Sequence, residues 1–182
     1  MRYVMTTFLF FSCTLLFSQK NVKEIINDRI PFSIEGKVID AYKYEDESGE
    51  NIYIITKKVD GEKTKIKGSK FQKTNSNWIS KWEINDQGYE ILLHFPYTRI
   101  IDIDKDGLAE TLFCYEIDQV SWKIMLHYKD KKFAVRSNIP QLDGDKYSCK
   151  YDEGFKNIPP IVFNYVKKYW QEIIDKENLK TD

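Results

Sequence analysis

Residues 89–117 read YEILLHFPYTRIIDIDKDGLAETLFCYEI, and this stretch decides the fold. Residues that favour strands stand at every second position on both sides of an acidic centre: Tyr89, Ile91, Leu93, Phe95, Thr111, Phe113, Tyr115 and Ile117. Successive side chains of a β-strand point to opposite faces, so this period of two predicts a strand, a loop and a second strand. The loop occupies residues 102–110.

The loop sequence DIDKDGLAE predicts a metal site. Calcium takes about six to eight oxygen ligands, which a short loop supplies from alternate side chains and one carbonyl. The predicted ligands are the carboxylates of Asp102, Asp104, Asp106 and Glu110 and the backbone carbonyl of Leu108. Gly107 stands where the backbone must turn sharply. The pattern therefore predicts one bound Ca²⁺. The alternative is an acidic turn that binds no ion, because Asp and Gly are ordinary turn residues.

The flanks of the loop exclude an EF-hand. An EF-hand needs a bidentate Glu where this chain has Phe113, and it needs a helix on each side of the loop. The loop resembles instead the Asp-x-Asp-x-Asp-Gly turns between strands of integrin-like and other extracellular repeat proteins. This chain carries one copy, which argues against a propeller of repeats.

The amino terminus predicts export. Arg2 precedes an apolar stretch at residues 8–17 that is too short to anchor in a bilayer, so residues 1–18 form a predicted signal peptide. Cys13 raises the alternative of lipid attachment, but it lies inside the apolar stretch. No later segment is apolar enough to span a membrane, and we expect the protein in the periplasm or at the cell surface.

Composition excludes one class of partner and favours one fold class. The chain has 28 basic and 28 acidic residues, so no net charge attracts it to nucleic acid. Residues 19–182 fit a single domain. An aromatic content of 15% suits half-buried sheets. We predict an α+β fold, mainly antiparallel β-sheet with a C-terminal amphipathic helix packed on it.

Two hairpins and a tryptophan strand supply the rest of the predicted sheet. Residues 36–44 and 51–59 form a hairpin with an acidic, solvated turn, and residues 122–137 form another. Trp78 and Trp82 are expected on one face of a strand, where a core role is favoured over a sugar-stacking platform. The lysine-rich segment 57–73 is expected to be an exposed connection or weak edge strands.

The carboxyl-terminal segment changes to a helical period. Apolar residues recur three and four positions apart at Val162, Tyr165, Val166, Tyr169, Trp170, Ile173 and Ile174. This spacing predicts an amphipathic helix at about residues 160–178 that covers one face of the sheet. Pro159 and Pro160 stand at its start, where a missing N–H costs least.

Cysteine and histidine add no second site. Cys114 and Cys149 could form a disulfide in an oxidising compartment or remain free thiols, and the sequence leaves both open. His94 and His127 lack the spacing of a shared metal site and are expected on strand surfaces.

The loop and the downstream stretch WKIMLHYKDKKFAVR at residues 122–136 together carry a family resemblance. From Trp78 to Arg136 the chain resembles a family of exported flavobacterial proteins labelled surface polysaccharide biosynthesis proteins. It is similar as a divergent member, because residues 118–121 and Ser137 replace the cysteines and glycine expected there. The resemblance implies a role with cell-surface glycan and no known catalytic residue.

Three functions remain open at this point. The first is an exported, non-catalytic envelope protein associated with surface polysaccharide, whose partner is glycan or an envelope protein. The second is a periplasmic glycan hydrolase, which needs paired carboxylates, for which the candidates are Glu83, Glu90, Glu116 and Asp118. The third is a structural protein-interaction module. The chain contains no nucleophile elbow, zinc-protease helix or phosphate-binding glycine loop, so we favour a protein that is not an enzyme.

Overall fold

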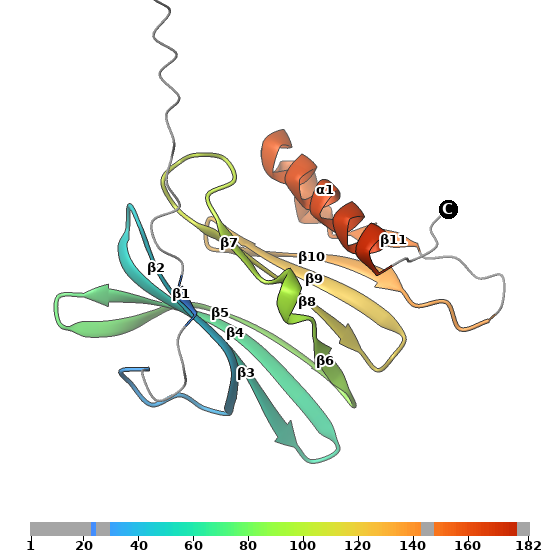
Figure 1. Ribbon diagram of the computed structural model, residues 1–182, viewed down its shortest axis with the longest axis horizontal. Helices are drawn as coiled ribbons and strands as arrows, with labels where there is room; N and C mark the ends of the chain where they lie inside the picture. The colour runs from blue at the N-terminus through green and yellow to red at the C-terminus, as the bar shows by residue number, and fades with distance from the viewer. Residues whose placement is uncertain (1–22, 25–29, 143–147, 178–182) are drawn as a thin grey trace, which may run out of the picture.

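The computed structural model describes residues 23–24, 30–142 and 148–177. The predicted signal peptide, residues 1–18, lies outside these ranges. Two antiparallel β-sheets and one C-terminal α-helix are stacked as three layers, with the helix on one side of the second sheet and the first sheet on the other (Figure 1). The predicted α+β class, mainly antiparallel β-sheet with a C-terminal helix, is confirmed.

The first sheet has its strands in chain order: β1 (Lys23–Glu24), β2 (Lys37–Asp46), β3 (Gly49–Asp60), β4 (Lys63–Thr74) and β5 (Asn77–Gly88). The second sheet has the order β11 (Cys149–Tyr151), β10 (Lys131–Asn138), β9 (Ser121–Tyr128), β8 (Glu110–Ile117) and β6 (Ile91–Leu93), and β7 (Arg99–Ile101) also pairs with β8. Two 3₁₀ turns, η2 (Phe95–Tyr97) and η3 (Glu153–Asn157), precede β7 and α1 (Pro160–Lys176).

The strand predicted before the loop is divided in two. Instead of one continuous strand from residue 89, β6 and β7 each pair with β8, and η2 separates them. Pro96 lies inside this turn, and a proline cannot donate the N–H that a continuous ladder would require. The arrangement of strand, loop and strand is present, with β7 leading directly into the loop.

The inner core lies between the two sheets. Its buried members come from both layers: Tyr44, Tyr53, Ile55, Ile66, Ile84, Ile91, Leu93, Ile100, Phe113, Tyr115, Ile117, Met125 and Ala134. The opposite face of the second sheet also packs, because α1 covers it. Strands β8 and β9 are therefore buried on both faces, which explains why so few of their residues are exposed.

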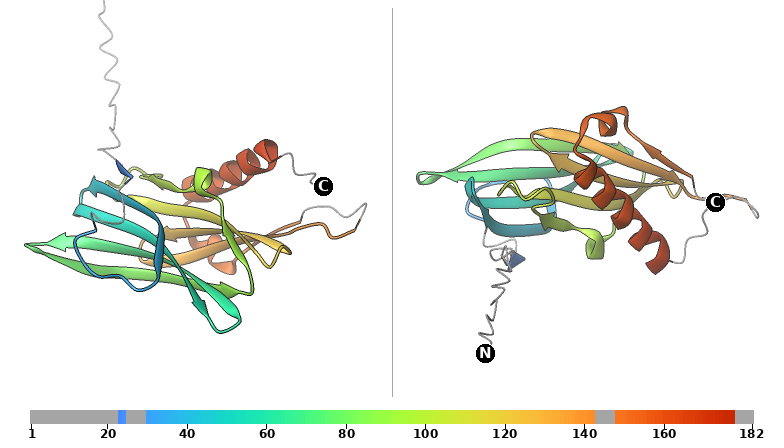
Figure 2. Two further views of the ribbon diagram at one scale, coloured as in Figure 1. Left: turned by 60° about the horizontal axis from the view of Figure 1, so that its bottom comes forward. Right: turned by 90° about the horizontal axis from the view of Figure 1, so that it is seen from above.

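Helix α1 begins at the predicted residue and ends at Lys176, with Glu177 as its C-cap, while residue 178 lies outside the described chain. Its buried side chains are six of the seven in the predicted stripe, Val162, Val166, Tyr169, Trp170, Ile173 and Ile174, whereas Tyr165 is half-buried. Pro160 occupies the first turn. Figure 2 shows α1 lying across the outer face of the second sheet, where its apolar stripe meets Leu112, Cys114 and Trp122.

The prediction for residues 57–73 is wrong. Strand β4 is an interior strand of the first sheet, paired on both sides with β3 and β5. Ile66 enters the inner core, while the lysines of the other face meet acids on adjacent strands, as Lys67 does with Glu83 at 3.2 Å. Such cross-strand pairs let a lysine-rich sequence occupy a central position.

The two tryptophans of β5 lie on opposite faces, which also differs from prediction. The β4–β5 register shifts at Lys70 and Phe71, so one extra residue in β5 reverses the alternation. Trp82 packs against the inner core and Trp78 against a small outer cluster that includes Phe32. The preference for a core role over a stacking platform agrees with both positions.

Neither thiol is bridged, and one histidine lies in the interior. Cys114 is buried and Cys149 is exposed, and both are free. His127, expected on a surface, is buried and stacks on Trp82 with ring centroids 3.7 Å apart. His94 is half-buried against Trp122. In the described part of the chain, no helix combines the length and apolar character needed to cross a membrane.

Candidate metal centre

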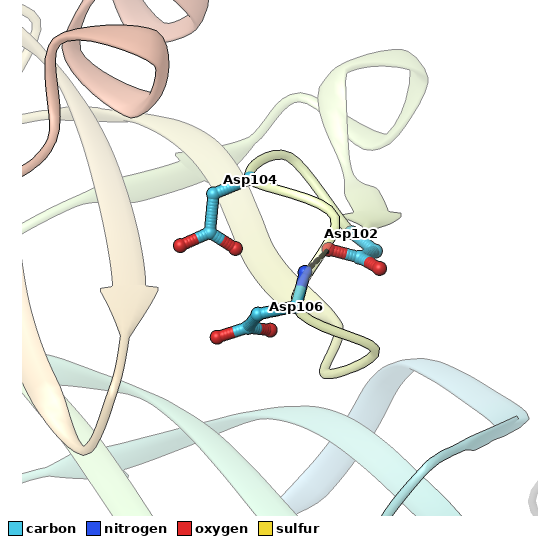
Figure 3. Close-up of side chains that lie close together, drawn as sticks. All are labelled: Asp102, Asp104 and Asp106. Carbon is cyan, nitrogen blue, oxygen red and sulfur yellow. Dashed lines mark hydrogen bonds between the residues drawn. The ribbon is translucent and has the colours of Figure 1, made fainter.

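Three of the predicted ligands come together in the loop between β7 and β8. Carboxylate oxygens of Asp102, Asp104 and Asp106 all lie within 4.8 Å of one another (Figure 3). Oxygen atoms at this spacing could hold a metal ion.

The loop is shaped by its own side chains. Asp102 accepts hydrogen bonds from the backbone N–H groups of Asp106 at 3.1 Å and Gly107 at 3.0 Å. Asp106 accepts one from Leu108 at 3.0 Å. Lys105 and Gly107 have φ angles of 61° and 86°, so the chain turns sharply at both. The backbone donors of the turn thus hold two of the three carboxylates in place.

Asp104 contributes an oxygen that nothing in the described chain satisfies. Its side chain is 10% exposed, its Oδ2 accepts a hydrogen bond from the Tyr128 hydroxyl at 2.8 Å, and its Oδ1 is buried with no hydrogen-bond partner among the described residues. Burial acts to raise the pKa of Asp104, but the bonds from Tyr128 and Lys129 outweigh it and lower the pKa. An ionised carboxylate oxygen left bare in the interior is costly unless a ligand completes it.

Glu110, the first residue of β8, is not part of the group formed by the three aspartates. It is 3% exposed, and its Oε2 accepts a hydrogen bond from the backbone N–H of Ile103 at 2.7 Å. Burial raises the pKa of Glu110 to about 8 against the effect of that bond, and the neighbouring aspartates raise it further. Glu110 is thus mostly protonated at neutral pH, whereas a bound cation would favour its carboxylate form.

Leu108, the fifth predicted ligand, keeps an exposed side chain, and its N–H donates to Asp106. Coordination by its carbonyl stays a prediction.

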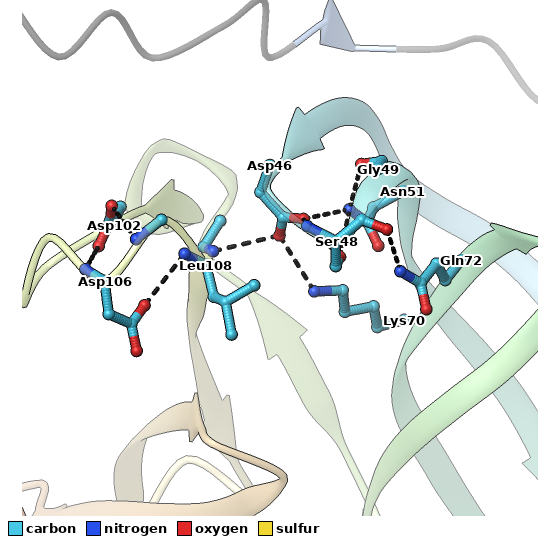
Figure 4. A network of polar contacts seen from close by, with 11 residues as sticks. Asp46, Ser48, Gly49, Asn51, Lys70, Gln72, Asp102, Asp106 and Leu108 are labelled. Atoms are coloured by element: carbon cyan, nitrogen blue, oxygen red, sulfur yellow. Dashed lines mark hydrogen bonds and ion pairs between the residues drawn. The ribbon is translucent and has the colours of Figure 1, made fainter.

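The tip of the β2–β3 hairpin docks onto the loop, which sequence reasoning did not foresee. The N–H of Glu47 donates to the carbonyl of Gly107 at 2.8 Å. The N–H of Ala109 donates to Asp46 at 3.2 Å (Figure 4). The Asp46 side chain is 4% exposed and also meets Lys70 at 3.3 Å. The prediction of a solvated acidic turn is wrong at Asp46, because the loop of the other sheet covers this residue.

A lysine forms ion pairs with two of the three carboxylates. Lys129, in the turn between β9 and β10, places its ammonium 3.2 Å from Asp104 and 2.9 Å from Asp106. Both bonded oxygens belong to aspartates of the candidate metal group. The sequence signal for this contact was weak, since residues 129–132 read only as a polar turn.

The carboxylates suggested for a hydrolase are divided between the sheets. Glu90, Glu116 and Asp118 line a shallow hollow of about 200 Å³, whereas Glu83 lies on β5 beside Lys67. Asp118 accepts a hydrogen bond from the backbone N–H of Glu90 at 2.8 Å, and Gln119 donates to the Glu90 carboxylate at 2.7 Å. The carboxylates of two of the three acids in the hollow, Asp118 and Glu90, therefore accept local hydrogen bonds.

Comparisons of the chain with protein-family models, with curated proteins and with solved structures find no match.

The loop offers only oxygen ligands, a set that suits hard divalent cations better than zinc or copper. The bare Oδ1 of Asp104 fits the same kind of ion.

Proposed function

We propose that this protein is a calcium-stabilised, non-catalytic module, exported to the cell envelope, where it associates with surface polysaccharide. The observation that carries the proposal is the buried, unpartnered Oδ1 of Asp104 beside the converging carboxylates of Asp102 and Asp106. A bound cation would satisfy that oxygen and remove the repulsion among the three charges.

Calcium suits the loop better than other common cations. The side chains of the group are all carboxylates, without the histidine or cysteine that zinc prefers. Magnesium demands a nearly ideal octahedron, whereas calcium accepts irregular shells built from carboxylates, carbonyls and water. A loop that alternates aspartates and turns at Gly107 supplies such an irregular shell.

The position of the loop supports a stabilising role. It is bonded through Gly107 and Ala109 to the β2–β3 hairpin of the first sheet, and Asp104 is bonded to Tyr128 of the second. An ion in the loop would hold these contacts together. Because the loop geometry exists only in the folded chain, binding would stabilise the fold by mass action.

Export and the link to polysaccharide are supported by the sequence. The apolar segment at residues 8–17 follows a positive amino terminus, and residues 78–136 resemble exported proteins with a surface polysaccharide label. The absence of a recognisable catalytic motif favours binding over turnover.

Thermal unfolding of the purified protein tests the calcium site. Wild-type protein should melt at a higher temperature in calcium than in chelator, and Asp104→Ala should abolish most of that difference. Asp130→Asn is the matched control, because Asp130 lies in the neighbouring turn at a φ of 59° that Asn tolerates, outside the carboxylate group. Equal melting of wild type and Asp104→Ala in both buffers would contradict the proposal.

Glycan arrays and pull-down from envelope extracts test the proposed association with surface polysaccharide. In calcium buffer we expect retention of surface polysaccharide. If neither a sugar nor an envelope protein is retained, the association with polysaccharide is wrong even where calcium binding holds.

A further inference from the structure

A cleft of about 220 Å³ lies beside the metal loop, walled by residues of both sheets. Three ammonium groups line it, those of Lys70 on β4, Lys81 on β5 and Lys129 in the β9–β10 turn. Lys70 is bound to Asp46, whereas Lys81 has no carboxylate at ion-pair distance among the described residues. Glu110 and Asp130 also line the cleft, and Lys129 is paired with Asp104 and Asp106, so Lys81 is the one lysine of this lining without an ion pair in the described chain.

Two residues of one wall of the cleft carry buried polar atoms without a hydrogen-bond partner among the described residues. Trp82 and His127 line this wall and stack on each other with an interplanar angle of 16°. Trp82 Nε1 and His127 Nε2 are buried without a hydrogen-bond partner in the part of the chain that the structure describes. Such groups are normally satisfied, which points to a polar ligand. Burial first, and then the charge of Lys70, lower the pKa of His127 to about 3, so this ring is neutral.

Lys129 belongs to both the cleft and the metal loop. Its side chain is 50% exposed, lines the cleft, and reaches across to Asp104 and Asp106. A cation held by the aspartates would neutralise the carboxylates of Asp104 and Asp106, to which the ammonium is bonded, and would repel the ammonium. The four-carbon stem of lysine can reorient, and the open side available to it is the cleft.

We propose that Lys129 couples the two sites, so that the cleft binds a carboxylate-bearing sugar residue when the loop holds calcium. Without the ion, Lys129 neutralises Asp104 and Asp106 and is withheld from the cleft. With the ion, the ammonium is released and joins Lys81 as a second unpaired cation. This inference rests on the proposed calcium site and names the class of glycan that the protein would recognise.

The dimensions and chemistry of the cleft support an acidic monosaccharide unit. Pockets for drug-sized ligands begin at about 300 Å³, so this cleft suits a single ring or its equivalent. The lysines suit a carboxylate, and Ser48 and Gln72, which also line the cleft, carry hydrogen-bonding groups for ring hydroxyls. The stacked faces of Trp82 and His127 are occupied by each other, so recognition would depend on charge and hydrogen bonds.

Saturation-transfer NMR with three small sugars tests the class of ligand. Methyl β-glucuronide should bind in calcium and bind about tenfold more weakly in chelator. Methyl β-glucoside, which lacks the carboxylate, should not bind. Tighter binding of glucose 6-phosphate than of the glucuronide would overturn the choice of a carboxylate, and glucuronide binding that is equal with and without calcium would overturn the coupling.

Lys129→Gln separates this inference from a structural role for the lysine. The variant should lose about tenfold in glucuronide affinity in calcium and gain affinity for calcium itself, because a competing cation is gone. Lys131→Gln, an exposed lysine on the same hairpin, should change neither. Unchanged glucuronide binding or unchanged calcium affinity in Lys129→Gln would contradict the coupling. No calcium uptake by the wild type would instead contradict the proposed metal site, and calcium uptake without glucuronide binding would overturn only the inference.

Discussion

Gly107 packs so closely against Glu47 that a Cβ at residue 107 would lie 2.1 Å from the Glu47 Cδ. The two residues lie in connections of different sheets, Glu47 between β2 and β3 and Gly107 between β7 and β8, and the carbonyl of Gly107 accepts a hydrogen bond from the N–H of Glu47. The metal loop and the first hairpin therefore meet at a glycine for two reasons, the close approach and the positive φ of 86°.

Replacing Gly107 with Ala should destabilise the protein by about 1–2 kcal/mol through the left-handed φ, and the contact with Glu47 adds to this only as far as the flexible end of that side chain cannot move aside. Chemical denaturation measures the loss. Gly61→Ala is the matched control, since Gly61 has a φ of 63° and a methyl group added there would meet nothing within 4 Å. A loss at Gly107 no larger than at Gly61 would mean that the hairpin yields freely. Adding Glu47→Ala to Gly107→Ala should recover part of the loss.

Tyr128 should tune the affinity for calcium without touching the ion. Its hydroxyl holds Asp104 Oδ2 at 2.8 Å while its ring is buried beside Phe133. Tyr128→Phe keeps the ring and frees the carboxylate, and loss of such an orienting bond lowers metal affinity by about 10–100-fold. Calcium titration of this variant beside Tyr89→Phe, an exposed position, checks the effect. Equal affinity in both variants would show that Asp104 needs no orientation.

His127 should make the protein less stable as pH falls. Burial lowers its pKa to about 3 in the folded chain, so below the unfolded value of about 6.5 the unfolded chain binds a proton that the native chain does not. The contribution of His127 to the free energy of unfolding is complete above pH ~6.5, and it falls by about 2 kcal/mol by pH ~5.

His127→Phe keeps the stack on Trp82 and removes the titrating group. Denaturation between pH ~5 and pH ~7 should show a weaker dependence on pH for the variant than for the wild type. If the free energy of unfolding of the two proteins depends equally on pH, protonation of His127 does not destabilise the fold.

Local patterns predicted the elements that local chemistry determines. The three- and four-residue period of residues 160–176 follows from one buried stripe on a helix, and it placed α1 correctly. The alternation of aspartates around Gly107 likewise predicted the three carboxylates that converge, although the fourth predicted carboxylate, Glu110, is not in their group. In both places the deciding interactions join residues close in sequence.

The errors occur where distant residues decide the outcome. Lys67 lies in an interior strand because Glu83 faces it across the sheet, and no local pattern contains that pairing. One extra residue near Lys81 puts Trp78 and Trp82 on opposite faces of the sheet. The alternation of side chains in the sequence does not reveal this bulge. Asp46 is covered by a loop more than sixty residues away, at Ala109, through a bond that only the stacking of the sheets creates.

Calorimetric titration of the purified protein with Ca²⁺ tests the central claim most directly. We predict saturable heat of binding for one ion per chain at or below about millimolar concentration, within the range of extracellular calcium modules, and its loss in Asp104→Ala. Absence of binding heat from the wild type at millimolar Ca²⁺ would contradict the account, because the carboxylates of Asp102, Asp104 and Asp106 would then be neutralised by Lys129 and the loop backbone alone.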